Sequence, residues 1–209
     1  RPEKNREVYV MVIGETSRAA NWSIYGYNRN TNPELTKIKG LTAFSHVLTE
    51  SNTTHKSVPM LMSSVPAHDF NSIYRQKGII PAFKEAGYRT AFFSNQRYNH
   101  SFIDFFGKEA DICDFIKEDA GDGSYNPSDD ELLKLVAAEL AENASKQFIV
   151  LHTYGSHFNY RERYPADHAF FLPDFPVDAE LKYKDNLINA YDNSIRYTDN
   201  FLARLIRML

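Results

Sequence analysis

Cysteine is almost absent from this chain of 209 residues. The single Cys113 excludes a disulfide within the chain and a zinc cluster built on cysteine thiolates. It does not decide the compartment, because proteins without disulfides occur in the cytosol and in the periplasm. Long apolar runs are missing too: no stretch approaches the ~20 apolar residues that cross a bilayer, and no signal-peptide pattern is recognisable.

An excess of charge of one sign is also lacking. The formal net charge is −3, which gives no electrostatic reason to expect nucleic acid as a partner. The 43% of apolar and 24% of charged residues exclude disordered, collagen-like and disulfide-rich classes, and the length suits one mid-sized domain. Because the chain starts at Arg1 without Met and runs straight into a predicted strand, we expect a piece of a longer protein.

Three apolar runs are predicted to form strands at the centre of one sheet: Glu7–Gly14, Thr90–Asn95 and Gln147–Tyr154. Helical patterns at Ile80–Ala86 and Ser128–Asn143 precede the second and third of these runs. Leu41–Leu48 and Ala110–Ile116 are weaker strand candidates. The alternation predicts an α/β fold with a mainly parallel central sheet and helices on both faces.

The last predicted element is a long helix over Asp178–Leu209. Its apolar residues recur at helical spacing on one broad face: Leu181, Leu187, Ile188, Tyr191, Ile195, Phe201, Leu202, Leu205 and Ile206. No residue typical of a helix end follows. A helix of this kind normally leads into another strand. We therefore expect apolar side chains near Leu205 and Leu209 to be left uncovered.

Polar residues follow each of the three predicted strands, where ligands of parallel sheets bind. Glu15 comes directly after the first strand, and is either a metal ligand or a cap for the following helix. Asn95 ends the second strand, where it either bonds a substrate oxygen or shapes a turn. His157 lies in the loop beyond the third strand and is free to reach a phosphate or metal, whereas His152 alternates within the strand as a core residue.

Hydroxyl groups gather in Ser51–Pro59, just ahead of an apolar helical run. A hydroxyl at a helix N-terminus is most often a cap. It becomes a nucleophile when a divalent metal lowers its pKa and the helix dipole favours an incoming phosphate.

Several of these segments resemble the phosphoethanolamine transferases of the alkaline phosphatase and sulfatase superfamily, which include the lipid A modifying enzymes behind polymyxin resistance. The resemblance rests on Gly14–Ala19, Tyr25–Pro33, Ser57–Pro59, Leu151–His157, Arg163–Pro165 and Asn189–Asp199. It implies that residues 1–209 are the N-terminal part of a sulfatase-like catalytic domain. It also implies a cell inner membrane protein with this domain on the periplasmic side and its membrane segment ahead of Arg1.

The resemblance assigns roles to particular residues. Glu15 matches the metal-binding glutamate, and Thr54 matches the threonine that binds zinc and takes up phosphoethanolamine as a phosphothreonine; Thr53 is the alternative. Asn95 or Gln96, together with His157, falls where the family binds substrate. The implied reaction moves phosphoethanolamine from phosphatidylethanolamine to lipid A or another glycan. We expect Glu15, Thr54 and His157 to converge at one end of the sheet.

The sequence departs from the family in three ways. It offers no lysine around Asn99 and His100, and Cys113 alone cannot make the family's disulfides. The Asp-His pair of a later D-H-G-E segment, which completes the zinc site, is absent. The zinc site is therefore incomplete in this chain, and we expect the 209 residues alone to be inactive.

Two further enzyme classes of the superfamily stay open. A sulfatase needs a C/S-x-P-x-R core; Ser57–Pro59 imitates its start, but Met60 and Leu61 follow and the Arg is missing. A phosphoglycerol transferase differs only in the donor head group, which the motifs do not determine.

Overall fold

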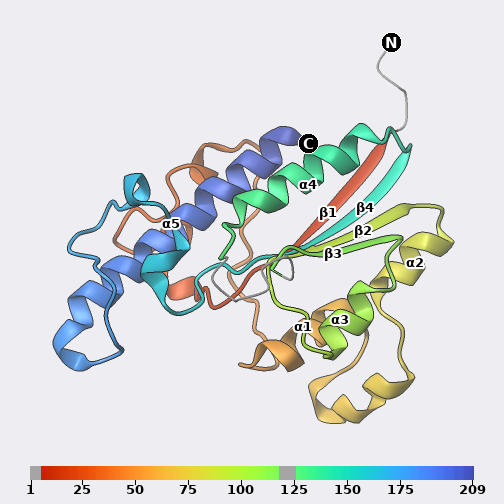
Figure 1. The fold of residues 1–209 in the computed structure, drawn as a ribbon, viewed down its shortest axis with the longest axis horizontal. Helices are drawn as coiled ribbons and strands as arrows, with labels where there is room; N and C mark the ends of the chain where they lie inside the picture. The colour runs from red at the N-terminus through yellow and green to blue at the C-terminus, as the bar shows by residue number, and fades with distance from the viewer. Residues whose placement is uncertain (1–5, 118–125) are drawn as a thin grey trace. The chain divides into compact units, whose positions relative to one another are not determined.

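The computed structural model describes residues 6–117 and 126–209, which form two compact units (Figure 1). The first unit contains the described parts of Arg1–Ile13 and Val47–Thr153, and the second contains Gly14–His46 and Tyr154–Leu209. The strands and α-helices are β1 (Glu7–Ile13), α1 (Thr54–Met62), α2 (Ile79–Glu85), β2 (Arg89–Ser94), α3 (Phe102–Gly107), β3 (Ile112–Phe115), α4 (Asp130–Ala141), β4 (Lys146–His152) and α5 (Lys184–Met208). Short 3-10 helices are η1 (Ala19–Asn21), η2 (Ser23–Tyr25), η3 (Leu35–Lys37), η4 (Ala67–Arg75), η5 (Tyr160–Arg163), η6 (Ala166–His168) and η7 (Leu181–Tyr183).

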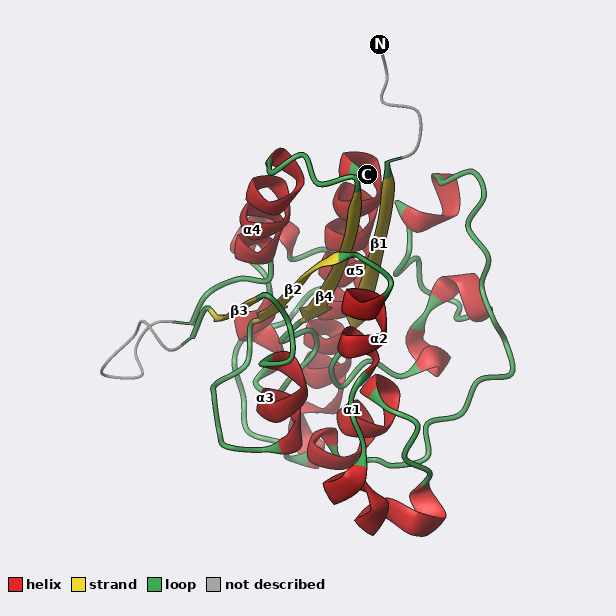
Figure 2. Ribbon diagram, turned by 90° about the vertical axis from the view of Figure 1, so that its right-hand side faces the viewer, coloured by secondary structure: helices red, strands yellow, loops and turns green. Residues whose placement is uncertain are grey.

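The first unit is built on a parallel four-stranded sheet in the order β1-β4-β2-β3. Consecutive side chains of a strand point to opposite faces, and β4 shows which helix covers each face. Gln147 Nε2 donates to the carbonyl oxygen of Glu139 in α4 (2.6 Å), whereas the ring of Phe148 stacks on Phe83 of α2 with centroids 3.7 Å apart. Helices therefore cover both faces, with α4 opposite α2 (Figure 2). The predicted fold class is confirmed.

A large hydrophobic cluster of the first unit lies on the α2 face of the sheet. It joins residues from strands and from helices α1, α2 and α3: Ile13, Val58, Met62, Val65, Ile73, Ile80, Phe92, Ile103, Phe106, Phe115, Phe148 and Val150. Complete burial of a Phe or Met side chain contributes about 1.5–3 kcal/mol, so this cluster stabilises the sheet substantially. The apolar runs at β2 and β4 were correctly predicted to be central strands.

Two strand predictions were wrong. Glu7–Gly14 was expected at the centre, but β1 is an edge strand of the sheet that the structure describes, and Tyr9 is 52% exposed. An aromatic residue suits this exposed position because the Tyr9 ring packs against Phe83 and Tyr88, with centroids 6.0 and 5.8 Å apart. Leu41–Leu48 is not a strand: the boundary between the two units falls within it, and its side chains are exposed, with Leu48 at 94%. Ala110–Ile116 is confirmed as β3.

The second unit is organised around α5, whose buried face is largely polar. The buried residues are Asn186, Asn189, Ala190, Asp192, Asn193, Ser194, Ile195, Tyr197, Asp199, Phe201, Ala203 and Leu205. The carboxylate of Asp192 accepts hydrogen bonds from Asn21 Nδ2 (2.9 Å), the Tyr27 hydroxyl (2.8 Å) and Arg29 (2.7 Å). Asp199 accepts from the backbone N–H groups of Glu34 and Leu35 at 2.8 and 3.0 Å. The helix thus anchors the N-terminal loops of its unit.

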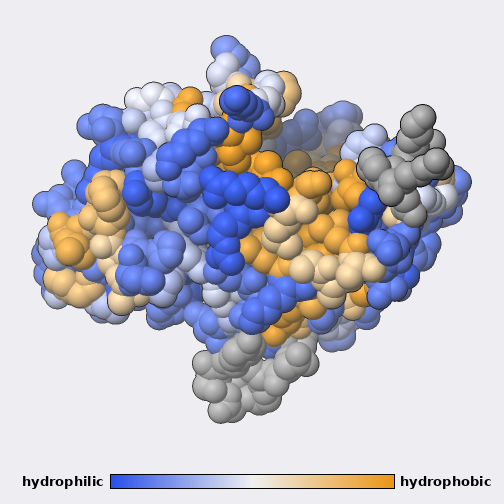
Figure 3. All heavy atoms as spheres, turned by 90° about the horizontal axis from the view of Figure 1, so that it is seen from above, coloured by the Kyte–Doolittle hydropathy of each residue, from blue (hydrophilic) through white to orange (hydrophobic). Residues whose placement is uncertain are grey.

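The predicted apolar face of this helix was only partly right. The helix begins at Lys184 rather than Asp178, and Leu181 is 92% exposed. Leu205, expected to be uncovered, is buried, whereas Leu209 is 58% exposed as expected. Further apolar side chains are exposed between η6 and α5, namely Phe170, Leu172 and Phe175. Figure 3 shows apolar surface at its left, where α5 begins in Figure 1. None of the helices within the described ranges is both long and apolar enough to cross a membrane.

Candidate functional site

Glu15 lies two residues beyond β1, in a loop that the second unit holds at several points. Its carboxylate accepts a hydrogen bond from Thr16 Oγ1 (2.6 Å), and its carbonyl oxygen accepts from the Ser156 N–H (3.1 Å). The first helix after it is η1, whose N-cap residue is Arg18 and whose first turn has no acidic residue. Glu15 is therefore not the N-cap residue of this helix, and its carboxylate stays a candidate metal ligand.

His157 follows β4 in the loop that contacts Glu15. Its Nδ1 is 2.7 Å from the carbonyl oxygen of Phe158, and its ring stacks on Tyr154 with centroids 4.7 Å apart. Because a carbonyl oxygen can only accept, this contact requires the proton on Nδ1 and leaves Nε2 of the exposed ring for a ligand. Gly155 permits the turn here, since its φ of +51° lies in the left-handed region.

The hydroxyl candidates lie at the start of α1 in the first unit. Thr53 is the N-cap residue with extended backbone angles, but its side chain makes no capping bond and instead pairs with Ser51 Oγ (3.2 Å). Thr54 is the first residue of the helix. No acidic residue lies in the first turn, so the positive end of the helix dipole is not neutralised there by a carboxylate. This environment favours an anion beside Thr54.

Asn95 and Gln96 directly follow β2, and they differ in the number of amide hydrogens left for a ligand. Asn95 is fully buried, and its Nδ2 donates to the Pro127 carbonyl (3.0 Å) and to Asp129 Oδ1 (2.7 Å). Both amide hydrogens are engaged, which leaves Oδ1 as the group without a described partner. Gln96 Nε2 donates to the Thr153 carbonyl (2.8 Å) and keeps one N–H for a ligand. Gln96 is therefore the better donor to a phosphate oxygen.

The structure brings some of the predicted site residues together. Glu15 and His157 lie on loops of the second unit that are hydrogen-bonded to each other through Ser156. Thr54, Asn95 and Gln96 belong to the first unit, so the convergence of Thr54 with Glu15 stays a prediction. Within residues 6–117 and 126–209, no group of three or more His, Cys, Asp or Glu side chains is arranged to hold a metal.

Two further observations bear on the residues around the predicted site. His152 was expected to be a core residue, and it is fully buried; burial lowers its pKa to about 4 and keeps the ring neutral. Next to Asn99 and His100, where no lysine is present, Lys108 Nζ donates to the Tyr98 hydroxyl at 2.5 Å and lies 4.2 Å from the centroid of its ring.

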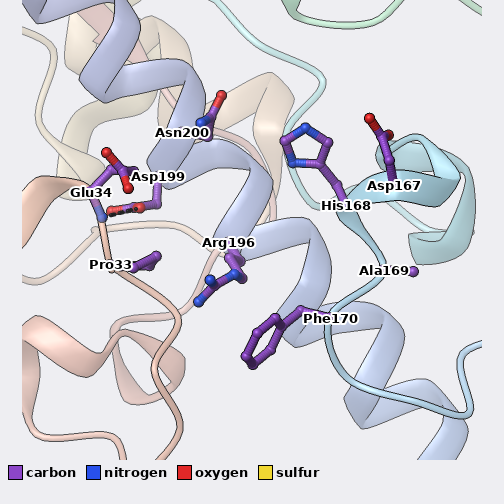
Figure 4. A pocket seen from close by; sticks show the side chains of 9 residues that line it. All are labelled: Pro33, Glu34, Asp167, His168, Ala169, Phe170, Arg196, Asp199 and Asn200. Carbon is purple, nitrogen blue, oxygen red and sulfur yellow. Dashed lines mark hydrogen bonds between the residues drawn. The ribbon is translucent and has the colours of Figure 1, made fainter.

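A separate pocket of about 230 Å³ lies in the second unit, lined by Pro33, Glu34, Asp167, His168, Ala169, Phe170, Arg196, Asp199 and Asn200 (Figure 4). Arg196 is stacked 4.1 Å above the Phe170 ring and donates to the Asn30 carbonyl (2.6 Å). Glu34 pairs with Lys37 and Arg207. The charged groups of this pocket are thus largely engaged in holding η3 and the 167–170 segment on α5.

Sequence reasoning missed the residues of α5 that hold the candidate site. Tyr191 Oη accepts from the Arg18 N–H (2.9 Å) and donates to the Thr16 carbonyl (2.8 Å). Ser194 Oγ is hydrogen-bonded to Ser156 Oγ (2.9 Å). Tyr191 was predicted as part of an apolar face. The run of Asn, Asp and Ser at helical spacing in Asn189–Asp199 was the available signal that this face is polar.

Comparison with known proteins identifies the family, since residues 7–209 match the sulfatase family over nearly the whole chain. The chain belongs to the sulfatase family. Its relatives include Kdo(2)-lipid A phosphoethanolamine 7''-transferase of Escherichia coli K12, 32% identical over 98% of this chain and 37% of the relative. Phosphatidylethanolamine transferase Mcr-1 of Escherichia coli is also 32% identical, over 96% of this chain and 39% of the relative.

Solved structures of the same group have the same fold. The soluble domain of lipooligosaccharide phosphoethanolamine transferase A from Neisseria meningitidis has a TM-score of 0.87 at 28% identity and covers all of this chain. The periplasmic domain of EptC from Escherichia coli, solved in complex with Zn, has a TM-score of 0.86 at 26% identity over 98% of this chain. This sulfatase-family chain spans 64% and 59% of those domains, and well under half of the length of its curated relatives.

Proposed function

We propose that the protein containing this chain transfers phosphoethanolamine from phosphatidylethanolamine to lipid A or another glycan, through a phosphothreonine at Thr54. The observation that carries the proposal is the pairing of the Glu15 and His157 loops in a chain whose relatives are phosphoethanolamine transferases. Both loops follow neighbouring parallel strands, β1 and β4, at their carboxyl ends, where ligands of such sheets bind.

The position of Thr54 supports its role as the nucleophile. Its hydroxyl belongs to the first residue of α1, where the helix dipole attracts a phosphate group. The neighbouring Thr53 is the N-cap residue and pairs with Ser51 Oγ; it stays the alternative. Thr54 Oγ1 is thus the hydroxyl that combines a helix start with the family's nucleophile position.

The proposed reaction has two displacements at phosphorus. In the first, Thr54 Oγ1 forms a bond to the phosphorus of the donor, the bond from phosphorus to the diacylglycerol oxygen breaks, and the threonine proton ends on diacylglycerol. In the second, an acceptor oxygen forms a bond to the same phosphorus, and the bond to Thr54 Oγ1 breaks. The proton lost by the acceptor returns to threonine. His157 donates to a phosphate oxygen through Nε2 when its ring carries both protons, the unengaged N–H of Gln96 donates to a phosphate oxygen as well, and Asn95 completes the substrate-binding set.

The donor chemistry of the chain is compatible with zinc. The Glu15 carboxylate and the Thr54 hydroxyl are oxygen ligands of the kind that zinc accepts, and they supply two of about four positions. Bound zinc would lower the pKa of the threonine hydroxyl and offset negative charge on the phosphate oxygens. Further ligands must come from other residues of the protein.

The donor is a membrane lipid, so the proposal places the reaction at a membrane surface. We propose that the domain lies on the periplasmic side of the inner membrane and is held there by a part of the protein outside these 209 residues. A periplasmic location is in line with the EptC domain, which is described as periplasmic.

The test uses the whole natural protein with a fluorescent phosphatidylethanolamine and mass spectrometry of the peptide containing residues 53 and 54. Thr54→Ala should abolish both diacylglycerol release and the modified peptide, whereas the matched variant Thr53→Ala should keep both. Activity retained by Thr54→Ala, or lost only in Thr53→Ala, would contradict the assignment. Release from phosphatidylglycerol but not from phosphatidylethanolamine would instead indicate a phosphoglycerol transferase.

A further inference from the structure

Tyr191 connects the middle of α5 to the loop that carries Glu15. Its hydroxyl donates to the carbonyl oxygen of Thr16 at 2.8 Å and accepts from the backbone N–H of Arg18 at 2.9 Å. A single oxygen atom thus bridges two backbone groups on either side of Ser17. These groups lie more than 170 residues away in the sequence, so the hydroxyl fixes the loop against a rigid element.

The loop needs such a restraint because Thr16 adopts a strained backbone. Its φ is +52°, in the left-handed region that β-branched residues rarely occupy. Such strain persists only where the surrounding structure imposes it. Thr16 in turn orients the carboxylate of Glu15, since Thr16 Oγ1 donates to Glu15 Oε1 at 2.6 Å. Tyr191 therefore acts on Glu15 through Thr16.

The surroundings of Tyr191 keep its hydroxyl protonated and fixed in direction, so that it can both donate and accept a hydrogen bond. The half-buried ring packs on Tyr160 with centroids 4.9 Å apart, which fixes the direction of the hydroxyl. Burial is the main cause that raises the pKa of Tyr191 above its ordinary value, so the hydroxyl keeps its proton. Ser194, three residues further along α5, is hydrogen-bonded to Ser156 Oγ at 2.9 Å, and the Ser156 N–H donates to the Glu15 carbonyl. One stretch of α5 thus holds Glu15 from both sides.

We propose that Tyr191 is a positioning residue whose hydroxyl sets the orientation of the Glu15 carboxylate for metal binding. The proposal rests on the proposed function, in which Glu15 is a zinc ligand. Groups that hold metal ligands in place typically change metal affinity by about 10- to 100-fold when they are removed.

The experiment compares Tyr191→Phe with Tyr164→Phe in the whole natural protein, because the 209 residues supply only part of the zinc site. Tyr164 is the matched control, because its hydroxyl is also hydrogen-bonded within the second unit, to Asp174 at 2.7 Å, but makes no described contact with residues 15–18. Zinc affinity is measured by calorimetry, with Glu15→Gln as the reference for loss of the ligand itself. Amide hydrogen exchange at Arg18 reports the loop directly, without any metal.

Tyr191→Phe is expected to weaken zinc binding at least tenfold and to accelerate exchange at the Arg18 amide. Tyr164→Phe should leave both close to wild type, even if it lowers the melting temperature as much. Equal zinc affinity in wild type and Tyr191→Phe, or an equal loss in Tyr164→Phe, would overturn the positioning role. If wild type binds zinc no better than Glu15→Gln, the metal role in the proposed function fails. Exchange at Arg18 then still decides whether Tyr191 holds the loop, and unchanged exchange would overturn that as well.

Discussion

Replacing Asp192 by alanine removes the carboxylate on which three N-terminal side chains converge. Asp192 has a side-chain exposure of 0%, and it accepts from Asn21, Tyr27 and Arg29 at 2.7 to 2.9 Å. Breaking a buried ion pair by removing one partner costs about 3–5 kcal/mol, because the remaining charge is left uncompensated. Arg29 is 28% exposed and keeps its bond to Asn189 Oδ1 (2.6 Å), so part of its charge stays solvated or paired. We expect a loss of about 3 kcal/mol, at the lower end of that range.

The assay for this prediction is urea unfolding followed by tryptophan fluorescence. Trp22 is the single tryptophan of the chain, and its indole N–H donates to Ser17 Oγ at 2.7 Å, so it reports on the second unit. Glu180→Gln is the control, because it removes an ion pair of the second unit, to Lys182, in which the lysine is 60% and the glutamate 50% exposed. Such surface pairs contribute about 0–1 kcal/mol. A loss below about 1 kcal/mol for Asp192→Ala would refute the buried network as a source of stability.

Three further predictions concern the first unit. Arg89→Met should lower the free energy of unfolding in urea by about 2–4 kcal/mol, because it leaves the Glu139 carboxylate, whose side chain is 3% exposed, without its cationic partner. The loss should be smaller in the double variant with Glu139→Met, and an equal loss would contradict the pairing. Burial lowers the pKa of His152 from its ordinary value of 6.5 to about 4 in the folded state. Below pH 6.5 the unfolded state therefore binds more protons than the folded state. The free energy of unfolding, measured from pH 7.5 down to 4.5, should therefore fall, and His152→Gln should flatten that slope; an unchanged slope would contradict the role of His152. Thr54→Ser in the whole natural protein should keep measurable diacylglycerol release; complete loss would indicate that the hydroxyl alone does not suffice.

The elements of the first unit were predictable where burial follows from local pattern. The runs at β2 and β4 are apolar because both of their faces are covered, and a parallel strand of this kind is visible in the sequence. The edge position of β1 was not predictable in this way. Strand order depends on which distant segment pairs with it, here Lys146–His152, and an apolar run carries no record of its partner.

The candidate site shows the same division between local and distant information. Glu15 and His157 were proposed as candidates because they follow apolar runs that end at the same edge of the sheet. Tyr191 was not found, because it acts on backbone groups of residues 16 and 18, and backbone groups leave no trace in residue types. The left-handed conformation of Thr16 was equally hidden, since a threonine does not signal a positive φ as glycine does.

The polar face of α5 gives a physical reason for two of the segments that carried the family resemblance. Tyr25–Pro33 supplies Tyr27 and Arg29, and Asn189–Asp199 supplies Asp192, which binds both of them. Buried charges are tolerated only when paired and hydrogen-bonded, so a change on either segment leaves an unsatisfied group on the other. The two segments are therefore coupled through the stability of the second unit. Together they fix the surface of α5 from which Tyr191 and Ser194 hold the loops of Glu15 and His157.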